Sequence, residues 1–501
     1  MIEAPTGLLF LFVMKVLIPT SFNLEKHIQS YPPSSYGCDK FDYDHALYLL
    51  SLITFVPARN KKITDSMKNG YTPLYSPLLQ SFVHDYRSYL NYFIQTGVIE
   101  TDNIYRSEAE FPNEGKSKGY RYTTEYCGGD IYEVQYGARF QRVLKKRRDE
   151  AYRALRDDYG HLIKWLWPEC KLEIDKNAAL EYLDQRRSAQ LLYPHLQDTK
   201  RDPIFNEKKK KDPETQYRFA KANVELIASG NIVCTVDGTV GRMHTVLTNM
   251  KSDLRNLITY LGAPLVSIDI KNSQPYLSTI LTTIQETKRG RHPLNTLKQQ
   301  IQTTINQTHP NSSLMLEEMN ELFDKQDFTI FKNLVSYNKH GANGEDLYTY
   351  MLKKGKELNL PYANRREAKE GMFEVLFSSN RHHSQAKRLF RELFPSVDKL
   401  FRSLKELDHS LLPRLLQKIE SFILLRVVTK RIARRYPSAH LFTIHQSIVT
   451  TLDYRERVRT MMHDELTKIV GLEPKLKDEY WRPENIDYEK YQYVSKARER
   501  L

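Results

Sequence analysis

The stretch Leu265-Val-Ser-Ile-Asp-Ile-Lys-Asn-Ser-Gln-Pro-Tyr276 decides how the rest of the chain is interpreted. Four apolar or small residues lead into Asp269, which predicts a buried strand with a carboxylate at its open end. The residues after it turn the chain into a short apolar run. A carboxylate at a strand end can present a metal ligand to a cleft, and it can equally cap the following helix. On this stretch alone, the helix cap is the simpler interpretation.

The composition indicates a basic protein of several structural units that suits a polyanionic partner. Its 501 residues are enough for roughly two to four units. Lys and Arg outnumber Asp and Glu by 75 to 61, and 32 tyrosines supply rings for base stacking or for ordinary cores. The widely spaced cysteines argue against a zinc knuckle or a disulfide framework and fit a reducing compartment. They are Cys38, Cys127, Cys170 and Cys234.

The chain begins with a short apolar run, Gly7 to Met14. Glu3 precedes it where a secretory signal would carry positive charge, no small-residue cleavage site follows, and the run is too short to cross a bilayer. Met14 resembles a more ordinary start. We therefore expect a cytoplasmic protein without a membrane partner.

Residues 77–135 resemble a winged helix, whereas residues 1–76 are Tyr- and Pro-rich and indicate no role. A helical pattern of apolar and aromatic residues runs from Phe82 to Ile94, and a strand-like piece and a basic turn, Glu114 to Tyr120, follow. A helix followed by a ribbon with a basic tip suits contact with nucleic acid, although many small domains share the pattern.

Two basic runs lie farther along the chain. Lys145–Arg148 opens a region of predicted long helices that extends to Gln197, and Lys208–Lys211 lies in a polar, Pro-flanked stretch before a short helix predicted from Phe219 to Ser229. Such a run is more often a solvated face than a binding site. Two of them upstream of one acidic site favour a track for a phosphate backbone.

A helix is predicted to begin at Asn364, because Glu367 three residues later completes a capping signature. The ordinary interpretation of this helix places its aromatic rings in the core and its cations in water. The alternative is that the cations bind a triphosphate while a ring stacks on the base. The residues concerned are spaced by four and share one face: Arg365, Lys369, Phe373 and Phe377.

This Arg-x-x-x-Lys-x-x-x-Phe-x-x-x-aromatic pattern resembles the fingers helix of A-family DNA polymerases, which share their palm with the single-subunit phage and mitochondrial RNA polymerases. Thr239–Arg242 resembles the family's segment that touches the primer-template duplex, and Leu265–Asp269 is similar to its first metal-binding motif. Further resemblances follow in the expected order up to the C-terminus, and the ordered set is more specific than any one segment. They are Asp346–Thr349 before the fingers helix, Leu416–Ser421 near the primer, Phe442–Val449 as a strand-turn-strand catalytic motif and Asp453–Val470 as the closing palm helix.

The resemblance, which covers Lys145 to the C-terminus, implies an α+β fold with right-hand polymerase architecture: a palm with a small antiparallel sheet, and helical fingers and thumb. The thumb would be residues 136–235, the fingers residues 291–404, and the palm residues 236–290 and 405–501. The implied function is template-directed nucleotidyl transfer, with DNA-dependent DNA synthesis in replication or repair of a mobile element or phage. The partners would be a DNA primer-template and dNTPs, with RNA as an alternative, and the protein would act as a monomer.

The resemblance also implies a site for two Mg²⁺ ions. Asp269 and the backbone carbonyl of Ile270 would be metal ligands. Gln274 falls where DNA polymerases carry a bulky Glu and RNA polymerases a Gly, so it would crowd a 2′-hydroxyl and favour deoxynucleotides. Arg365, Lys369, Phe373 and Phe377 would bind the nucleotide, and Arg242, Gln417 and His445 would contact primer or template. Asp269 and Lys369 would be catalytic, since Lys369, with Arg365, would neutralise phosphate charge that develops in the transition state.

The second catalytic motif departs from the family pattern, because His-Asp-Glu or His-Asp-Ser stands here as His445-Gln446-Ser447. Gln446 has a carbonyl oxygen but no charge, which makes it a poor Mg²⁺ ligand. Natural loss of activity, an introduced inactivating change, or rescue by another carboxylate would each explain it, and Asp453 is too far along the strand for such a rescue. Two other functions stay open: a catalytically silent nucleic-acid-binding protein, and an RNA polymerase suggested by the His-x-Ser form.

Overall fold

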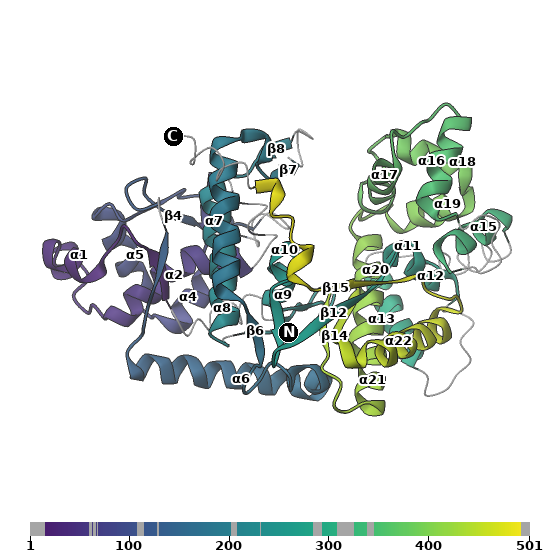
Figure 1. Cartoon of the computed structure of the whole chain (residues 1–501). Coiled ribbons are helices and arrows are strands. Elements are labelled where there is room, and N and C mark those ends of the chain that lie inside the picture. Colours follow the sequence, from purple (N-terminus) through teal and green to yellow (C-terminus); the bar gives the residue numbers. More distant parts are fainter. Residues whose placement is uncertain are drawn as a thin grey trace. The chain divides into compact units, whose positions relative to one another are not determined.

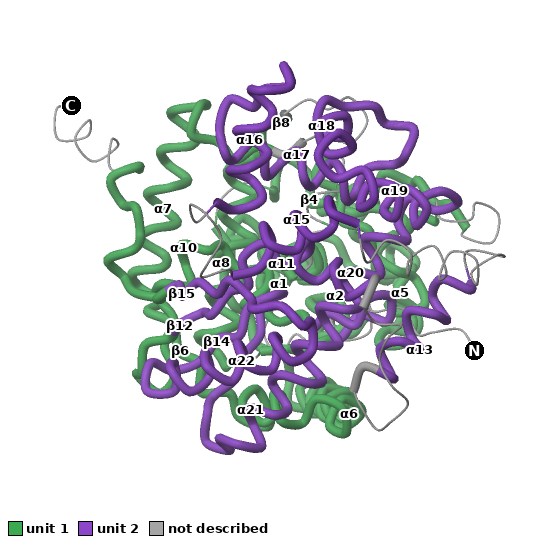
Figure 2. Tube along the Cα trace, turned by 90° about the vertical axis from the view of Figure 1, so that its right-hand side faces the viewer, with its two compact units in different colours: residues 1–235, 244–265, 480–501 green, residues 236–243, 266–479 purple. Residues whose placement is uncertain are grey.

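The computed structural model describes residues 16–59, 63, 67, 69–107, 115–127, 130–201, 208–230, 232–283, 293–307, 325–337 and 345–491. The apolar run at residues 7–14 and Glu114 lie outside these ranges. The chain divides into two compact units, and Figure 2 colours them separately. Unit 1 comprises residues 1–235, 244–265 and 480–501, and unit 2 comprises residues 236–243 and 266–479. Helices and antiparallel ribbons occur together, which confirms the α+β prediction.

Unit 1 contains most of the described N-terminal half (Figure 2). Its elements are β1 (Val16–Pro19), α1 (Leu24–Ser30), a 3₁₀ helix (Pro33–Tyr36), α2 (Tyr43–Arg59), β2 (Thr72–Pro73), α4 (Ser76–Phe82), α5 (Tyr86–Gln95), β3 (Ile99–Thr101), β4 (Gly119–Tyr122), β5 (Ile131–Val134), α6 (Ala138–Ile163), β6 (Leu172–Ile174), α7 (Lys176–Leu192), a 3₁₀ helix (Pro194–Leu196), β7 (Thr199–Arg201), β8 (Lys208–Lys210), α8 (Pro213–Ala228), α9 (Val246–Asn249), α10 (Ser252–Arg255), β11 (Ile258–Tyr260) and the 3₁₀ helices Pro483–Asn485 and Glu489–Tyr491.

The core of unit 1 is built around α2, which is buried on all sides from Ala46 to Arg59. A helix that is apolar all round is expected to be enclosed by other elements, and α5, α8 and β1 pack against it. The helical pattern predicted from residue 82 to 94 is two helices, because the chain leaves α4 at Val83 and enters α5 after Asp85. The pattern looked continuous because both helices contribute apolar residues to the same core.

The helix and ribbon expected of a winged helix are present in unit 1. After α5 comes β3, which pairs antiparallel with β4, and β2 pairs with the other edge of β4. The winged-helix assignment itself stays a prediction. The ribbon places the basic residues near Lys116 and Lys118 at its far end, where a bridge between Arg106 and Lys116 extends it.

The predicted region of long helices contains α6 and α7, with the short strand β6 between them. Lys145–Arg148 lies within the 26 residues of α6. α7 and α8 run side by side (Figure 1). α8 begins earlier than predicted, since Asp212 caps it by accepting a hydrogen bond of 2.8 Å from the amide of Thr215.

Unit 2 contains the elements that carry the candidate site. They are α11 (Ser273–Ser278), α12 (Ile280–Thr283), α13 (Pro293–Asn306), α15 (Gln326–Val335), α16 (Leu347–Glu357), α17 (Arg365–Phe377), α18 (Gln385–Leu393), α19 (Pro395–Leu404), α20 (Leu411–Ser421), a π-helix (Phe422–Val428), α21 (Thr429–Arg435), β13 (Phe442–Ile444), β14 (Ser447–Thr451), a 3₁₀ helix (Leu452–Tyr454) and α22 (Arg455–Val470).

Three strands have residues in both units, because a unit boundary falls within each of them: β9 (Thr235–Val236), β10 (Met243–His244) and β12 (Ala263–Ile270). β15 (Leu476–Tyr480) ends at the last division. Within unit 2, β12 has β14 as a neighbour and β13 lies beyond β14, while β15 also pairs with β12. The side chains of Val266, Ile268 and Ile270 are buried. β12 is therefore the buried strand that the sequence predicts.

The predicted layout of palm, fingers and thumb stays a prediction. The residues predicted as thumb belong to unit 1, whereas the described residues predicted as fingers belong to unit 2 together with most of the two predicted palm segments. In the described part of the chain we find no helix with the length and apolar character that a membrane span requires. The four cysteines carry free thiols.

Candidate active site

Asp269 lies next to the end of β12, and its carboxylate faces the β13–β14 hairpin. The Oγ of Ser447 donates a hydrogen bond of 2.7 Å to Oδ1 of Asp269. The cap position of α11 is occupied by Asn272, which adopts the left-handed conformation with φ of 56°. The interpretation of Asp269 as a helix cap is therefore wrong, because its carboxylate accepts a hydrogen bond from the hairpin instead.

The hairpin has the predicted form of strand, turn and strand. Ile444 pairs with Ser447, so His445 and Gln446 form a two-residue turn. His445 is exposed with φ of 50°, and Gln446 is half-buried. The side chain of Gln446 lies close enough to Asp269 to lower the pKa of that carboxyl by hydrogen bonding. Where the family resemblance implies a second carboxylate, this chain has an uncharged amide.

The electrostatic surroundings of Asp269 bring further residues to the site. Burial raises the pKa of Asp269, and the negative charge of Glu479 on β15 raises it further. The hydrogen bonds from Ser447 and Gln446 oppose this shift, as does the positive charge of Lys369 on α17. The charge of Lys369 therefore reaches Asp269, and its role at the site stays a prediction. Glu479 is a carboxylate that the sequence did not single out, because only strand pairing brings it beside β12.

Cations gather near the end of β12. The amide of Lys271 donates a hydrogen bond of 2.8 Å to the carbonyl of Lys475. Burial lowers the pKa of Lys475, the charges of Lys271 and Arg365 lower it further, and Asp346 opposes them. Lys271, Lys475, Arg365 and Lys369 thus lie within electrostatic reach of one another or of Asp269. These four cations lie among three carboxylates, those of Asp269, Glu479 and Asp346, and their positive charge can attract a polyanionic ligand.

Three of the four stripe residues on α17 are exposed, and Phe377 is half-buried. α17 buries its opposite face, which consists of Ala368, Gly371, Met372, Val375 and Leu376. Phe373 is 43% exposed, and its ring centroid lies 5.8 Å from that of Phe377 and 5.9 Å from Nζ of Lys369. An exposed ring beside a lysine contradicts the ordinary interpretation for Phe373, in which the aromatic side chains belong to the core. The ring and the cation are both free to meet a ligand from solvent.

Arg365, at the start of the same stripe, forms an ion pair with Asp346. Asp346 caps α16 by accepting a hydrogen bond of 2.9 Å from the amide of Thr349. Burial by itself would raise the pKa of Asp346, but the hydrogen bonds from Arg365 and Thr349 lower it below its usual value. Asn364 caps α17 as predicted, with a hydrogen bond of 3.0 Å from the amide of Glu367 to its Oδ1.

A second cluster joins two of the predicted site residues through Glu420 of α20. Glu420 is 1% exposed and receives hydrogen bonds from Nη2 of Arg242 at 2.5 Å and from Nε2 of Gln274 at 2.6 Å. Burial raises the pKa of Glu420 and the charge of Asp269 adds to the shift, whereas Arg242 and Gln274 oppose it. The predicted sugar-selecting residue and the predicted duplex contact are therefore held by one carboxylate near Asp269.

The structure gives the positions of the remaining predicted site residues but does not test their roles. Ile270 follows Asp269 with a buried side chain, and Gln417 lies half-buried in α20, one turn before Glu420. Their roles as backbone metal ligand and primer contact, together with that of His445, stay predictions. Glu420 itself was missed, since one acidic residue in a mostly apolar helix gives no signal before its partners are known.

Comparison with known proteins adds little to this picture. The chain matches no protein-family model and no curated protein. Among solved structures, it is similar to the POL domain of Pol1 from M. smegmatis in complex with DNA primer-template and dNTP, with 11% sequence identity and a TM-score of 0.32. The match covers 69% of this chain and 74% of that chain. A TM-score of this size does not establish a shared fold.

Proposed function

We propose that unit 2 carries a nucleotidyl-transfer site that extends a DNA primer along a template with dNTPs. The observation that carries this proposal is the placement of Asp269 within electrostatic reach of Lys369, on the exposed stripe of α17. A polymerase needs a carboxylate at the reacting phosphate and cations around the triphosphate. Both are found on the described residues of one compact unit.

In this proposal the cations bind and orient the triphosphate. Lys369 and Arg365 contact its phosphates, and Lys271 and Lys475 add positive charge beside them. Arg365 must leave Asp346 to do so, and its 50% exposed side chain has room to move. Phe373 stacks on the incoming base, since its exposed ring lies in line with the two cations along α17.

The donor set fits one Mg²⁺ better than two. Asp269 offers a carboxylate, Ile270 a backbone carbonyl, and Glu479 a second carboxylate whose charge already opposes ionisation of Asp269. A bound divalent cation would supply Lewis-acid activation of the primer 3′-hydroxyl and would relieve that repulsion. Gln446 brings an uncharged amide near Asp269. No group of three His, Cys, Asp or Glu side chains that could hold a metal occurs among the described residues. The expected second ion has no ligand set of its own here.

The choice of sugar would be made at Gln274. Its side chain is 7% exposed and held by Glu420, so it fills space that a smaller residue would leave open. A bulky, fixed side chain at this position excludes a 2′-hydroxyl by contact. We therefore infer deoxynucleotides as the substrates.

Primer extension tests the proposal. The full chain, Asp269→Asn and Gln446→Asp are compared with Mg²⁺ and either dNTPs or NTPs on a primed template. We expect Gln446→Asp to extend faster than the unmodified chain, by at least about tenfold, because a charged ligand replaces a neutral one. Asp269→Asn should extend no primer.

A matched control is Asp453→Asn, which removes an exposed carboxylate of the same unit. It should leave extension unchanged. If neither the unmodified chain nor Gln446→Asp adds a nucleotide of either class, nucleotidyl transfer is ruled out.

A second function is favoured by the hydrogen bonds at Asp269. Ser447 donates to its carboxylate, and Gln446 lies close enough to stabilise the charge by hydrogen bonding, which satisfies the acidic group without a metal. A protein with such a site would bind primer-template but perform no transfer. It predicts binding that weakens steeply with salt and does not depend on Mg²⁺. Salt-insensitive binding would exclude this function.

A further inference from the structure

A cleft of about 970 Å³ in unit 1 is lined by cations and tyrosines. The elements around it are α4, α5 and the ribbon that carries β3 and β4. Its basic residues are Arg87, Arg106, Lys116 and Lys118. Its aromatic residues are Tyr75, Tyr86, Tyr105 and Tyr120. Among the described residues, its lining includes no Asp or Glu.

We propose that this cleft binds a segment of single-stranded nucleic acid. The cations bind successive phosphates, and the exposed tyrosine rings stack on unpaired bases. This combination is how proteins bind single strands without reading their sequence. The site lies in unit 1, and it does not depend on the nucleotidyl transfer proposed for unit 2.

The basic side of the cleft is the far end of the ribbon. Arg106 and Lys116 stand opposite each other, joined by backbone hydrogen bonds of 3.0 and 2.9 Å. Lys116 forms an ion pair of 2.7 Å with Asp102. Lys118 follows two residues later and hydrogen-bonds to Asn103 at 2.8 Å. The described lining of the cleft thus carries four cationic side chains and no carboxylate, which suits an anionic ligand.

Asp102 also fixes the shape of this end of the ribbon. Its Oδ1 accepts hydrogen bonds from the amides of Gly119 at 2.8 Å and Ile104 at 3.1 Å. Burial alone would raise the pKa of Asp102, but these bonds and the one from Lys116 lower it. The backbone at Gly119 packs so closely against Tyr71 that a Cβ on Gly119 would lie 2.8 Å from Cβ of Tyr71. A site held in shape before the ligand arrives loses less entropy on binding.

The tyrosines divide into buried and exposed rings. Tyr86 and Tyr120 are 5% and 8% exposed and form the floor, whereas Tyr75 is 45% and Tyr105 is 63% exposed. Arg87, beside Tyr86 at the start of α5, is exposed and donates a hydrogen bond of 3.2 Å to its hydroxyl. Exposed rings between cations suit unpaired bases. The bases of a duplex are already stacked, which leaves such rings without a partner.

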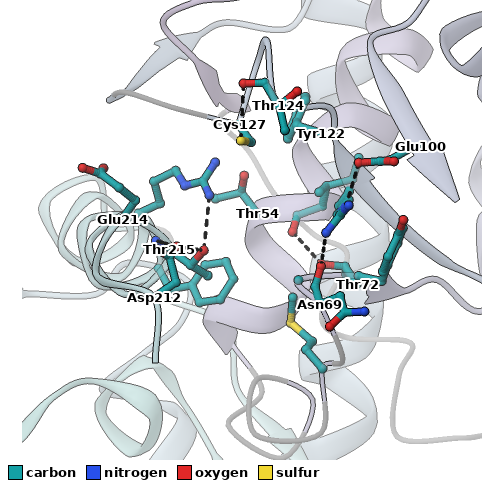
Figure 3. Close-up of a pocket in the computed structure, with 17 residues that line it drawn as sticks. Thr54, Asn69, Thr72, Glu100, Tyr122, Thr124, Cys127, Asp212, Glu214 and Thr215 are labelled. Atoms are coloured by element: carbon teal, nitrogen blue, oxygen red, sulfur yellow. Dashed lines mark hydrogen bonds and ion pairs between the residues drawn. The ribbon is translucent and has the colours of Figure 1, made fainter. Parts of the chain in front are cut away.

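A second pocket of the same unit differs from this cleft because carboxylates line it. It has a volume of about 730 Å³, and Glu100, Asp212 and Glu214 lie among its lining residues (Figure 3). Its Arg121 is paired with Glu100 at 2.8 Å. Carboxylates repel a phosphate backbone, so this pocket is unsuited to nucleic acid.

Fluorescence anisotropy with the full chain tests the proposal. The probes are labelled oligo-dT and oligo-rU of about 20 nucleotides and a blunt duplex of the same length. The variants are Tyr105→Ala, Tyr105→Phe, Arg87→Ala and Lys118→Ala. Lys26→Ala, which removes an exposed cation of α1 in the same unit, is the matched control. Thermal melting confirms that each variant is folded.

We expect Tyr105→Ala to weaken single-strand binding by roughly 5- to 150-fold, because one stacked base is lost. Tyr105→Phe keeps the ring and should bind as the unmodified chain does. The slope of log affinity against log salt is negative. Arg87→Ala and Lys118→Ala should each make it less steep by about 0.7, and Lys26→Ala should leave it unchanged. The oligo-dT and oligo-rU arms show whether DNA or RNA is preferred.

Two results would overturn the proposal. One is binding to the blunt duplex that equals single-strand binding and is unaffected by Tyr105→Ala. The other is a salt slope that is the same in Arg87→Ala, Lys118→Ala and the control. Neither result depends on primer extension, so a failure here and a failure of nucleotidyl transfer in unit 2 are distinguishable.

Discussion

The amide nitrogen of Gln274 donates a hydrogen bond of 2.6 Å to Oε2 of Glu420, whose carboxylate is fully buried. The other oxygen of Glu420 accepts from Arg242 at 2.5 Å. Glu420 therefore holds two residues that are far apart in sequence: Gln274 of α11, near the end of β12, and Arg242, just before β10. Both were predicted to contact substrate, and neither prediction included the residue that positions them.

Replacing Gln274 by Glu should destabilise the protein, although Glu is the residue that the DNA polymerase resemblance leads one to expect there. The donor becomes an acceptor, and two carboxylates face each other in a buried site. We expect the free energy of unfolding to fall by about 2 to 4 kcal/mol at neutral pH. Urea denaturation measures it, and Gln274→Met, which removes the donor without adding charge, is the control.

The sign of the pH dependence distinguishes this explanation from simple misfit. Acid protonates one of the two facing carboxylates and restores a donor, so the loss in Gln274→Glu should shrink as the pH falls from 7 towards 5. A loss that is the same at both values would contradict the electrostatic explanation.

Replacing Gln446 by Asp should make stability depend on Mg²⁺. Without a metal, a second carboxylate would face Asp269, whose pKa is already raised by burial and by Glu479. The variant should therefore melt at a lower temperature than the unmodified chain in EDTA and recover when Mg²⁺ is added. The unmodified chain should respond less. An equal response of both would show that position 446 does not face a metal site.

Gly371 should not tolerate alanine, because α17 packs too closely at this position. A Cβ there would lie 2.6 Å from Oη of Tyr362 and 3.1 Å from Cβ of Ala386. We expect Gly371→Ala to lower the free energy of unfolding by about 1 to 3 kcal/mol. The matched control is Gly160→Ala in α6, where the nearest atom is 3.5 Å away and alanine should stabilise by about 0.5 to 1 kcal/mol.

A double variant checks the cause of that loss. The hydroxyl of Tyr362 is buried and has no hydrogen-bond partner in the described structure. Tyr362→Phe removes the atom closest to the new Cβ, so Gly371→Ala with Tyr362→Phe should recover most of the stability. Purely additive effects would contradict the proposed contact.

Lys405 should make stability increase with pH in the alkaline range. Its Nζ donates to the carbonyls of Val375 at 2.5 Å and Ser378 at 3.2 Å, at the end of α17. Burial lowers its pKa from 10.5 to about 8, and the charge of Lys387 contributes. Between these two values the unfolded chain holds more protons than the folded one, so raising the pH favours folding.

The comparison with Lys405→Met isolates this effect from other titrating groups. The free energy of unfolding of the unmodified chain, relative to that of the variant, should rise by roughly 1 kcal/mol per pH unit between pH 8 and 10. It should be flat below pH 7. A difference that does not change with pH would show that Lys405 keeps its ordinary pKa when folded.

Local signals made part of this structure predictable. The Asn364 cap, the buried strand ending near Asp269 and the strand-turn-strand at His445 and Gln446 all depend on residues within a few positions of each other. The start of α8 was missed, although Asp212 followed by proline is a local signal, because the charged residues after them obscured the helical pattern. These errors concern boundaries rather than element types.

The contacts of the candidate site required the fold. Glu479 approaches Asp269 only because β15 pairs with β12, and Glu420 meets Gln274 only because α11 packs on α20. The exposure of Phe373 was equally hidden, since a stripe of rings at a spacing of four is the same for a core face and a ligand face. Small residues on the opposite face of α17, such as Gly371 and Ala368, decide which face is buried.

The two-residue turn between β13 and β14 limits how this site can change by mutation. Side chains alternate between the faces of a strand, so Ser447 reaches Asp269 only while the pairing of Ile444 with Ser447 is kept. A substitution at Gln446 alters one group. An inserted or deleted residue in the turn would send Ser447 to the opposite face and move every later side chain of β14 with it. Single substitutions can therefore change the charge of the site by one unit at a time. They leave the register between β13 and β14 unchanged.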